Sequence, residues 1–117
     1  MSRAFAFRTP AQKEARLRQL GACAVCGESL DDVVEHAHHV IPNQSGQRGN
    51  PDHAWIASAD NCVVLCDLCH DQVHEGGKYR TGGVAPPSYF EHSHGPNRAA
   101  HLRWVALLDA RTRSVWR

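Results

Sequence analysis

Two Cys-x-x-Cys pairs, Cys23/Cys26 and Cys66/Cys69, constrain the fold of this 117-residue chain more than any other feature. Four thiolates from two such pairs can converge tetrahedrally on one zinc ion. Apolar residues are few and scattered between the pairs, so a hydrophobic core alone would be thin there. Metal-binding energy adds to folding energy in small domains of this kind. We therefore predict a structural Zn²⁺ that staples the fold.

The fifth cysteine, Cys62, makes the cysteine count odd, which argues against a closed set of disulfides. Reduced thiols that hold zinc fit a cytosol-like compartment. Cys62 is expected to be a buried apolar residue, although its spacing from Cys66 offers an alternative ligand pair. The N-terminus does not resemble a signal peptide, and no apolar stretch is long enough to span a bilayer. We expect a cytoplasmic protein with no membrane partner.

The net charge of +1 is unevenly distributed along the chain. Residues 1–20 and residues 98–117 each carry five cationic residues against one acidic residue, whereas residues 21–97 carry three against ten. Basic flanks beside an acidic, metal-binding middle would suit a protein that grips phosphates from both sides. Two solvated helices of ordinary arginine content explain the pattern equally well.

Capping residues and apolar spacing predict a helix at each end of the chain. Thr9 and Pro10 are typical of a helix start and Gly21 of a helix end, so a helix is expected over about 10–20. Its inward residues are expected to be Ala11, Ala15 or Leu17, and Leu20. A second helix is expected over about 97–112, with Leu102, Val105 and Leu108 inward.

Between these helices the pattern predicts a strand, a long loop, a second strand and a short helix. The expected ranges are 33–41 for the first strand, 42–58 for the loop, 62–65 for the second strand, 67–74 for the helix and 78–96 for a further loop.

Two histidine pairs fall on these central elements. His38 and His39 are neighbours in the first strand, and strand pleating sends them to opposite faces. Such a pair suits one metal ligand and one base, because neutral imidazole performs both tasks near neutral pH. His70 and His74 share one face of the short helix, and Cys69 is turned about 100° from His70. One helix can therefore offer Cys69 to zinc and His70 to a second site, although exposed histidines without a ligand role remain the alternative.

Three segments carry a resemblance to a known family. Val34–Pro42 (Val-Glu-His-Ala-His-His-Val-Ile-Pro), Asn61–Cys66 and Cys69-His70 resemble the HNH endonuclease signature in its zinc-knuckle variety, over roughly residues 21–75. The resemblance implies an α+β fold: a small ββα-metal (His-Me finger) domain, here stapled by the four-cysteine zinc site and flanked by N- and C-terminal helices. We expect a single HNH nuclease domain over residues 1–117.

The resemblance also implies roles for individual residues. His39 would be the general base, and Asn61 would pin the long loop and so orient His39. His38 and His70 would bind the catalytic metal, with His74 as a further ligand like that of colicin-type members. A three-histidine site can take Mg²⁺, Mn²⁺, Ni²⁺ or Zn²⁺.

The implied activity is metal-dependent hydrolysis of DNA phosphodiester bonds, and we expect the DNA to be double-stranded. Arg48, Lys78 and Arg80 flank the expected site and are candidate phosphate contacts. An immunity protein would be a partner if the chain were the toxin end of a larger protein, delivered into the cytoplasm of a target cell. The alternative function is a non-catalytic zinc-knuckle module that binds nucleic acid.

Other polar and aromatic residues are expected to have smaller parts. His36 shares strand parity with His38, and a supporting or exposed position is expected for it rather than metal ligation. Glu35 could orient a histidine or face solvent. No catalytic part is expected for His53, His92 or His94, and Trp55, Trp104 and Trp116 are expected to be packing residues.

Overall fold

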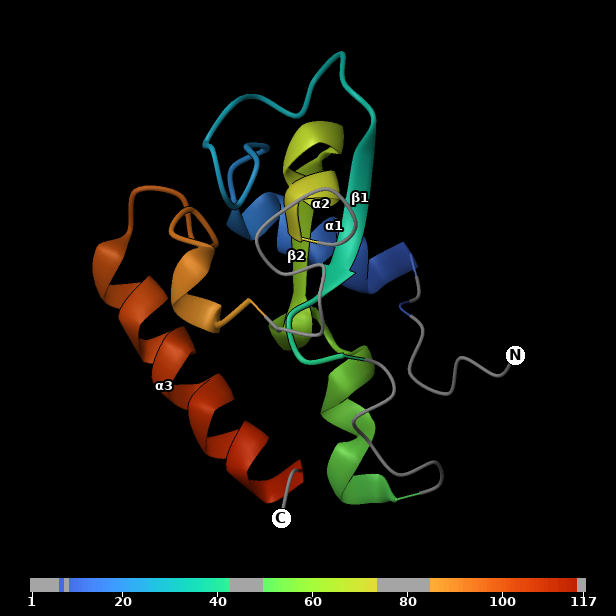
Figure 1. Ribbon diagram of the computed structural model, residues 1–117, viewed down its shortest axis with the longest axis vertical. Helices are drawn as coiled ribbons and strands as arrows, with labels where there is room; N and C mark the ends of the chain where they lie inside the picture. Colours follow the sequence, from blue (N-terminus) through green and yellow to red (C-terminus); the bar gives the residue numbers. More distant parts are fainter. Residues whose placement is uncertain (1–6, 8, 43–49, 74–84, 116–117) are drawn as a thin grey trace.

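An antiparallel hairpin lies at the centre of the molecule (Figure 1). The computed structural model describes residues 7, 9–42, 50–73 and 85–115. Strand β1 (Glu35–His39) pairs with β2 (Cys62–Cys66), with His39 opposite Cys62 and Glu35 opposite Cys66. β2 has the sequence Cys-Val-Val-Leu-Cys, and its first four residues are buried, whereas β1 is half-buried along its length. The hairpin therefore puts an apolar strand in the core and a histidine-rich strand at its border.

Helix α2 (Asp67–Val73) follows β2 without a break and contacts both strands. The predicted order of strand, connection, strand and helix is thus confirmed, as is the α+β fold class. The expected loop over 42–58 is wrong over part of its length, because Pro51–Ala57 forms a 3-10 helix, η2. A second 3-10 helix, η3 (Ala59–Asn61), lies between this loop and β2. Asn50 starts η2 by accepting a hydrogen bond from the Asp52 N–H at 2.9 Å, with Pro51 at the first position.

Helix α1 (Thr9–Arg18) confirms the predicted N-terminal helix. It ends where Leu20 and Gly21 take positive φ values of 57° and 72°, and the Gly21 N–H bonds the Arg16 carbonyl at 3.0 Å. The predicted inward face is partly wrong. Ala15 is buried, but Leu20 is 71% exposed and Gln19 is fully buried instead.

The Gln19 carboxamide explains this difference. Its Nε2 donates to the Val64 carbonyl at 2.8 Å, and its Oε1 accepts from the Val64 N–H at 2.8 Å. The same Nε2 also donates to the Ala22 carbonyl at 2.8 Å. Gln19 therefore pairs with β2 much as a residue of a neighbouring strand would, and Leu20 faces outward instead.

Arg18 joins three further segments. Its guanidinium donates to the carbonyls of Ser93 at 2.9 Å, Ala59 at 2.9 Å and Cys62 at 2.6 Å. Burial lowers the pKa of Arg18, partly opposed by the nearby Cys62 and Asp60. One guanidinium thus provides the hydrogen-bond donors for a carbonyl in η3, one in β2 and one in the segment that precedes the last helix.

The last helix, α3 (Arg98–Val115), runs along the outside of the molecule (Figure 1), and a short 3-10 helix, η4 (Pro87–Tyr89), precedes it. Among the α3 side chains whose burial is described, those of His101, Trp104 and Leu108 are buried, whereas Leu102 is 53% exposed, contrary to the predicted face. The Trp104 indole N–H donates to the Asp60 carbonyl at 2.7 Å. This hydrogen bond orients α3 so that His101 and Trp104, rather than Leu102, face the core.

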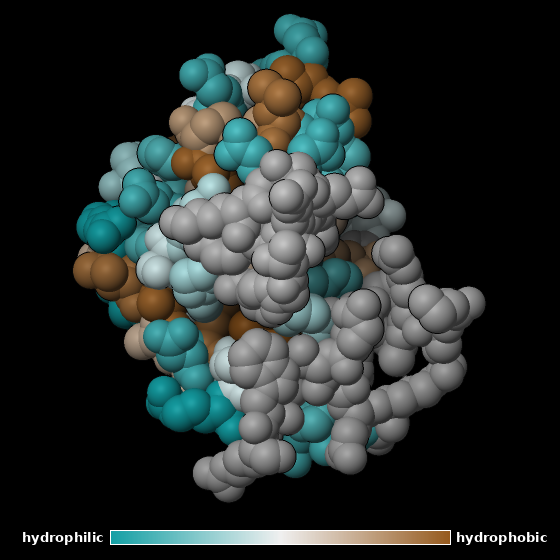
Figure 2. Space-filling model, in the orientation of Figure 1, coloured by the Kyte–Doolittle hydropathy of each residue, from teal (hydrophilic) through white to brown (hydrophobic). Residues whose placement is uncertain are grey.

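Most of the coloured surface in Figure 2 is hydrophilic, and the hydrophobic residues on that face lie in separate patches. Across the described ranges, no helix combines the length and the apolar character that crossing a membrane requires.

A buried hydroxyl links the segment before α3 to the helix itself. Ser93 Oγ lies 2.9 Å from His94 Nδ1 and 2.9 Å from His101 Nδ1. One hydroxyl can donate to only one of these nitrogens, so the other imidazole must donate to it. Burial, with Arg18 nearby, lowers the pKa of His94 to about 4, and burial also lowers the pKa of His101.

Replacing Gln19 by leucine should destabilise the fold by about 2–4 kcal/mol, because the buried N–H and C=O of Val64 lose their side-chain partner. Urea unfolding measures the loss. The matched control is Gln72→Leu, at an exposed position of α2, which should change the free energy of unfolding by about 0.5 kcal/mol or less. Equal effects of the two substitutions would contradict the strand-like role of Gln19.

Acid should destabilise the fold through His94. Its folded pKa of about 4 lies below the ordinary 6.5, so the unfolded chain binds the proton more readily between these values. The stabilising contribution is present above pH 6.5 and is lost as pH falls toward 4. We expect a loss of about 1–2 kcal/mol, reduced from the full shift because His94 is partly solvated. Unfolding curves of the wild type and His94→Asn should converge over this range, and parallel curves would contradict the assignment.

Candidate metal centre and nuclease site

The first cysteine pair lies in a tight turn that α1 leads into. Ala22 pairs with Ser29, the Cys23 N–H donates to the Glu28 carbonyl at 2.8 Å, and the Gly27 N–H donates to the Cys23 carbonyl at 3.0 Å. Gly27 has a φ of 76°, and a Cβ there would lie 3.1 Å from the His92 ring. The turn therefore requires glycine after Cys26, both for its backbone and for the packing of His92.

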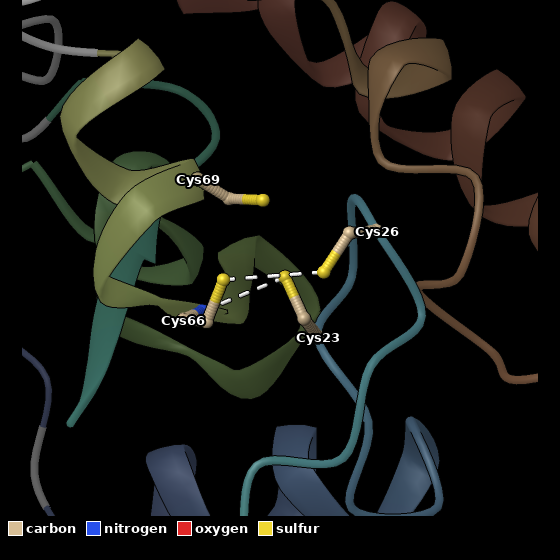
Figure 3. Close-up of side chains that lie close together, drawn as sticks. All are labelled: Cys23, Cys26, Cys66 and Cys69. Carbon is tan, nitrogen blue, oxygen red and sulfur yellow. Dashed lines mark hydrogen bonds between the residues drawn. The ribbon is translucent and has the colours of Figure 1, made fainter. Parts of the chain in front are cut away.

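The second pair comes from the junction of β2 and α2. Cys66 ends the strand and Cys69 lies in the first turn of the helix. Figure 3 shows the four side chains pointing toward a common centre, and their sulfurs all lie within 4.8 Å of one another. The Cys26 and Cys66 sulfurs are 3.9 Å apart. Tetrahedral zinc with bonds of about 2.3 Å places its sulfurs about 3.8 Å apart, so the donor set fits this ion.

The fifth cysteine is not part of this cluster. Cys62 is fully buried in the core, as predicted, and burial raises the pKa of its thiol to about 12, opposed by Arg18. The four-cysteine cluster is the group that could hold a metal ion among the residues the structure describes. The fold therefore does not place Cys62 with Cys66 as an alternative pair of metal ligands.

The four sulfurs differ in their surroundings. Burial works against a thiolate at Cys23, but hydrogen bonds from Cys26, Cys66 and Val25 outweigh it and lower the pKa of this thiol. The Cys66 and Val25 N–H groups lie 3.4 Å and 3.5 Å from Cys23 Sγ. Burial raises the pKa of Cys26 and, together with the neighbouring sulfurs, that of Cys69. A cation at the centre would offset this repulsion, as expected of a metal site.

A second cluster lies where β1 meets α2. The rings of His38 and His70 meet edge to face with their centroids 6.3 Å apart. His36 stacks on His70, with centroids 4.3 Å apart and planes 11° apart, and its Nε2 lies 2.7 Å from Asp67 Oδ1. His36 therefore lies beside this cluster in a supporting position, one of the two positions that the sequence predicted for it. Adjacent residues Cys69 and His70 face different clusters, as the helical turn between them predicts.

His38 and His39 have different surroundings, as strand alternation predicts. His38 packs against the buried ring of Phe90, with centroids 5.5 Å apart and planes inclined by 42°. His39 stacks on Phe7, with centroids 3.8 Å apart and planes 11° apart. Neither phenylalanine could be predicted from the sequence, because neither falls within the patterned region and no local signal pairs it with a histidine.

Asn61 is fully buried and fastens the chain just after His39. Its Oδ1 accepts from the Ile41 N–H at 2.8 Å, and its Nδ2 donates to the carbonyls of Ile41 at 3.0 Å and Ile56 at 2.9 Å. The Asn61 carbonyl accepts from the Val40 N–H at 3.0 Å. The residues that follow His39 are therefore tied to η2 and η3.

Several predicted site residues are not placed by the structure. His74, Arg48, Lys78 and Arg80 lie outside the described residues, as does Trp116. Trp104 is buried and Trp55 half-buried, with the Arg111 guanidinium 5.4 Å from the Trp55 ring centroid, so both are packing residues as predicted.

Residues 23–76 match the family model described as HNH endonuclease. No curated protein and no solved structure matches the chain. The matched range contains both cysteine pairs, the hairpin and α2, whereas α1 and α3 lie outside it. Residues 23–76 thus form a domain of the HNH endonuclease family, with its ββα-metal fold and a four-cysteine cluster consistent with the zinc-knuckle variety.

Proposed function

We propose that the protein is a metal-dependent endonuclease that hydrolyses DNA phosphodiester bonds. The observation that carries this proposal is the meeting of β1 and α2, where the rings of His38 and His70 approach edge to face. Two imidazoles on facing elements suit a divalent ion, and His39, the residue after His38 in β1, suits a base. Membership of residues 23–76 in a nuclease family supports the same chemistry.

His39 is the proposed general base. A neutral imidazole accepts a proton from water near neutral pH, which makes the water a nucleophile toward phosphorus. The base must be held at a defined place, since proton transfer depends on its distance and direction. Asn61 supports this by fixing both peptide groups of Ile41 and the N–H of Val40.

His38 and His70 are the proposed metal ligands, with His74 as the third. When bound, a divalent ion would stabilise the negative charge that develops on the leaving 3′ oxygen. The His36 ring supports His70 by stacking on it, and the Asp67 carboxylate holds His36 in place by a hydrogen bond. Imidazole ligands suit Ni²⁺ and Zn²⁺, whereas Mg²⁺ and Mn²⁺ prefer oxygen ligands, and all four ions are candidates for the catalytic metal.

The proposed substrate is double-stranded DNA. Arg48, Lys78 and Arg80 are the proposed phosphate contacts, on the ground of their positive charge and their positions next to the histidine segments. The proposed location is the cytoplasm, either of the producing cell or, for a toxin domain with an immunity protein as partner, of a target cell.

The four-cysteine cluster is proposed to hold structural Zn²⁺, separate from the histidines. This division follows from chemistry, because closed thiolate sites hold zinc for structure and leave no open position for a substrate.

A second function also has an observation in its favour: a non-catalytic zinc-knuckle module that binds nucleic acid. Over residues 9–42 and 50–73, the cysteines form a complete ligand set and the histidines do not. This function predicts one metal per chain and no cleavage with any ion.

Plasmid cleavage decides between the two functions. With the chelated protein resupplied with Mg²⁺, Mn²⁺, Ni²⁺ or Zn²⁺, the wild type should cleave, and His39→Ala should lower the rate by about 10²–10⁴-fold. His70→Ala should lose the response to added metal. Asp71→Ala, at the exposed neighbouring position of α2, is the control and should retain activity. DNA binding without cleavage under any of these ions would support the second function.

Zinc content tests the cysteine cluster. Cys69→Ala should lose the zinc and unfold or lose several kcal/mol of stability, because the ion's binding energy is part of the folding energy. The same substitution at Cys62 should retain one zinc per chain, at a cost of about 1–2 kcal/mol for the lost packing. Elemental analysis and thermal unfolding supply both readouts. Loss of zinc from Cys62→Ala would contradict the proposed ligand set.

A further inference from the structure

The ring of Phe7 lies flat on the imidazole of His39, with centroids 3.8 Å apart and planes only 11° apart. We propose that Phe7 is a positioning residue that sets the orientation of His39 for proton transfer. This inference rests on the proposed role of His39 as base. It adds a residue that lies outside the matched range of the family, residues 23–76.

A histidine base needs its ring held as well as its backbone. The torsion that rotates the imidazole about its bond to Cβ is broad and only weakly restricted by its own chemistry. Hydrogen bonds from Asn61 hold the backbone just beyond His39 but do not act on that torsion. A flat stack restricts it, because rotating the imidazole would drive its edge into the phenyl ring.

The geometry of the stack is suited to orienting the His39 ring and does not cover its nitrogens. Imidazole nitrogens lie at the ring edge, and a partner stacked on the face leaves the bonding directions of those nitrogens in the ring plane. The neighbouring pair of His38 and Phe90 differs, since those rings are inclined by 42° at 5.5 Å and Phe90 is fully buried. Phe7 is only partly buried and also packs against the core, which anchors the ring that contacts His39.

Two substitutions of Phe7 distinguish the effect of its ring stacked on His39 from the effect of its apolar packing. Phe7→Leu keeps a large apolar side chain but removes the flat ring, and it should lower kcat for plasmid cleavage by about 3- to 10-fold with KM nearly unchanged. Phe7→Tyr keeps the ring and should retain kcat within about two-fold, by the same reasoning. Zinc content and the thermal unfolding midpoint of each variant show whether the fold is intact.

A nuclear magnetic resonance measurement tests the stack without any cleavage. The ring protons of His39, assigned with His39→Ala, should be shifted upfield by the Phe7 ring current in the wild type and in Phe7→Tyr. They should return downfield in Phe7→Leu. Unshifted His39 protons in the wild type would overturn the inference.

The kinetic outcomes also separate the inference from the function on which it rests. A wild type that cleaves, with Phe7→Leu equally or more active, refutes the positioning role alone; greater activity would mean that Phe7 shields the base from substrate. A rise in KM with unchanged kcat in Phe7→Leu refutes it too. A wild type that shows no cleavage with any of the four metal ions refutes the proposed nuclease function, and the role of Phe7 with it.

Discussion

The backbone of β2 runs through the core, and every polar group along it needs a hydrogen-bond partner. On one edge β1 supplies these partners through the antiparallel ladder. On the other edge there is no strand in the described part of the chain, and Val64 is instead bonded by the Gln19 carboxamide and the Ala24 N–H. The Cys62 carbonyl, at the start of the strand, accepts from Arg18. A two-stranded sheet can therefore be buried because Arg18, at the end of α1, and Gln19 and Ala24, just after it, complete its hydrogen bonding.

The junction of β2 and α2 contributes residues to both the cysteine cluster and the histidine cluster. β2 ends at Cys66, and the first turn of α2 carries both Cys69 and His70. The helical turn between these two residues directs one to the sulfur cluster and the other to the histidine cluster. Any change in how α2 packs on the hairpin would move both at once. Structural zinc, if bound as proposed, would therefore also stabilise the position of His70.

Segments outside the matched HNH range contact both the histidines of β1 and the cysteine turn. Phe7 and Phe90 contact the two neighbouring histidines of β1, one by a flat stack and the other by a tilted contact. Residues 90–95 also close over the cysteine turn, where the His92 N–H bonds the Ala24 carbonyl at 2.8 Å. A small domain buries a limited part of its surface, so the flanking segments add contacts that the central hairpin does not supply.

Some of this organisation was determined by the sequence by itself. The Cys-x-x-Cys spacing, the apolar run of β2, the paired histidines and Asn61 are local signals, and they predicted the element order and the four converging sulfurs. Such patterns work because ligand spacing and strand or helix period depend on residues that are near one another in the chain. Wrong predictions arose where a polar side chain took an inward position, as Gln19 did in place of Leu20 and His101 in place of Leu102. Only the tertiary structure decided these, along with the partners of His36 and His39, because each depends on how distant segments dock and on hydrogen bonds that form only after docking.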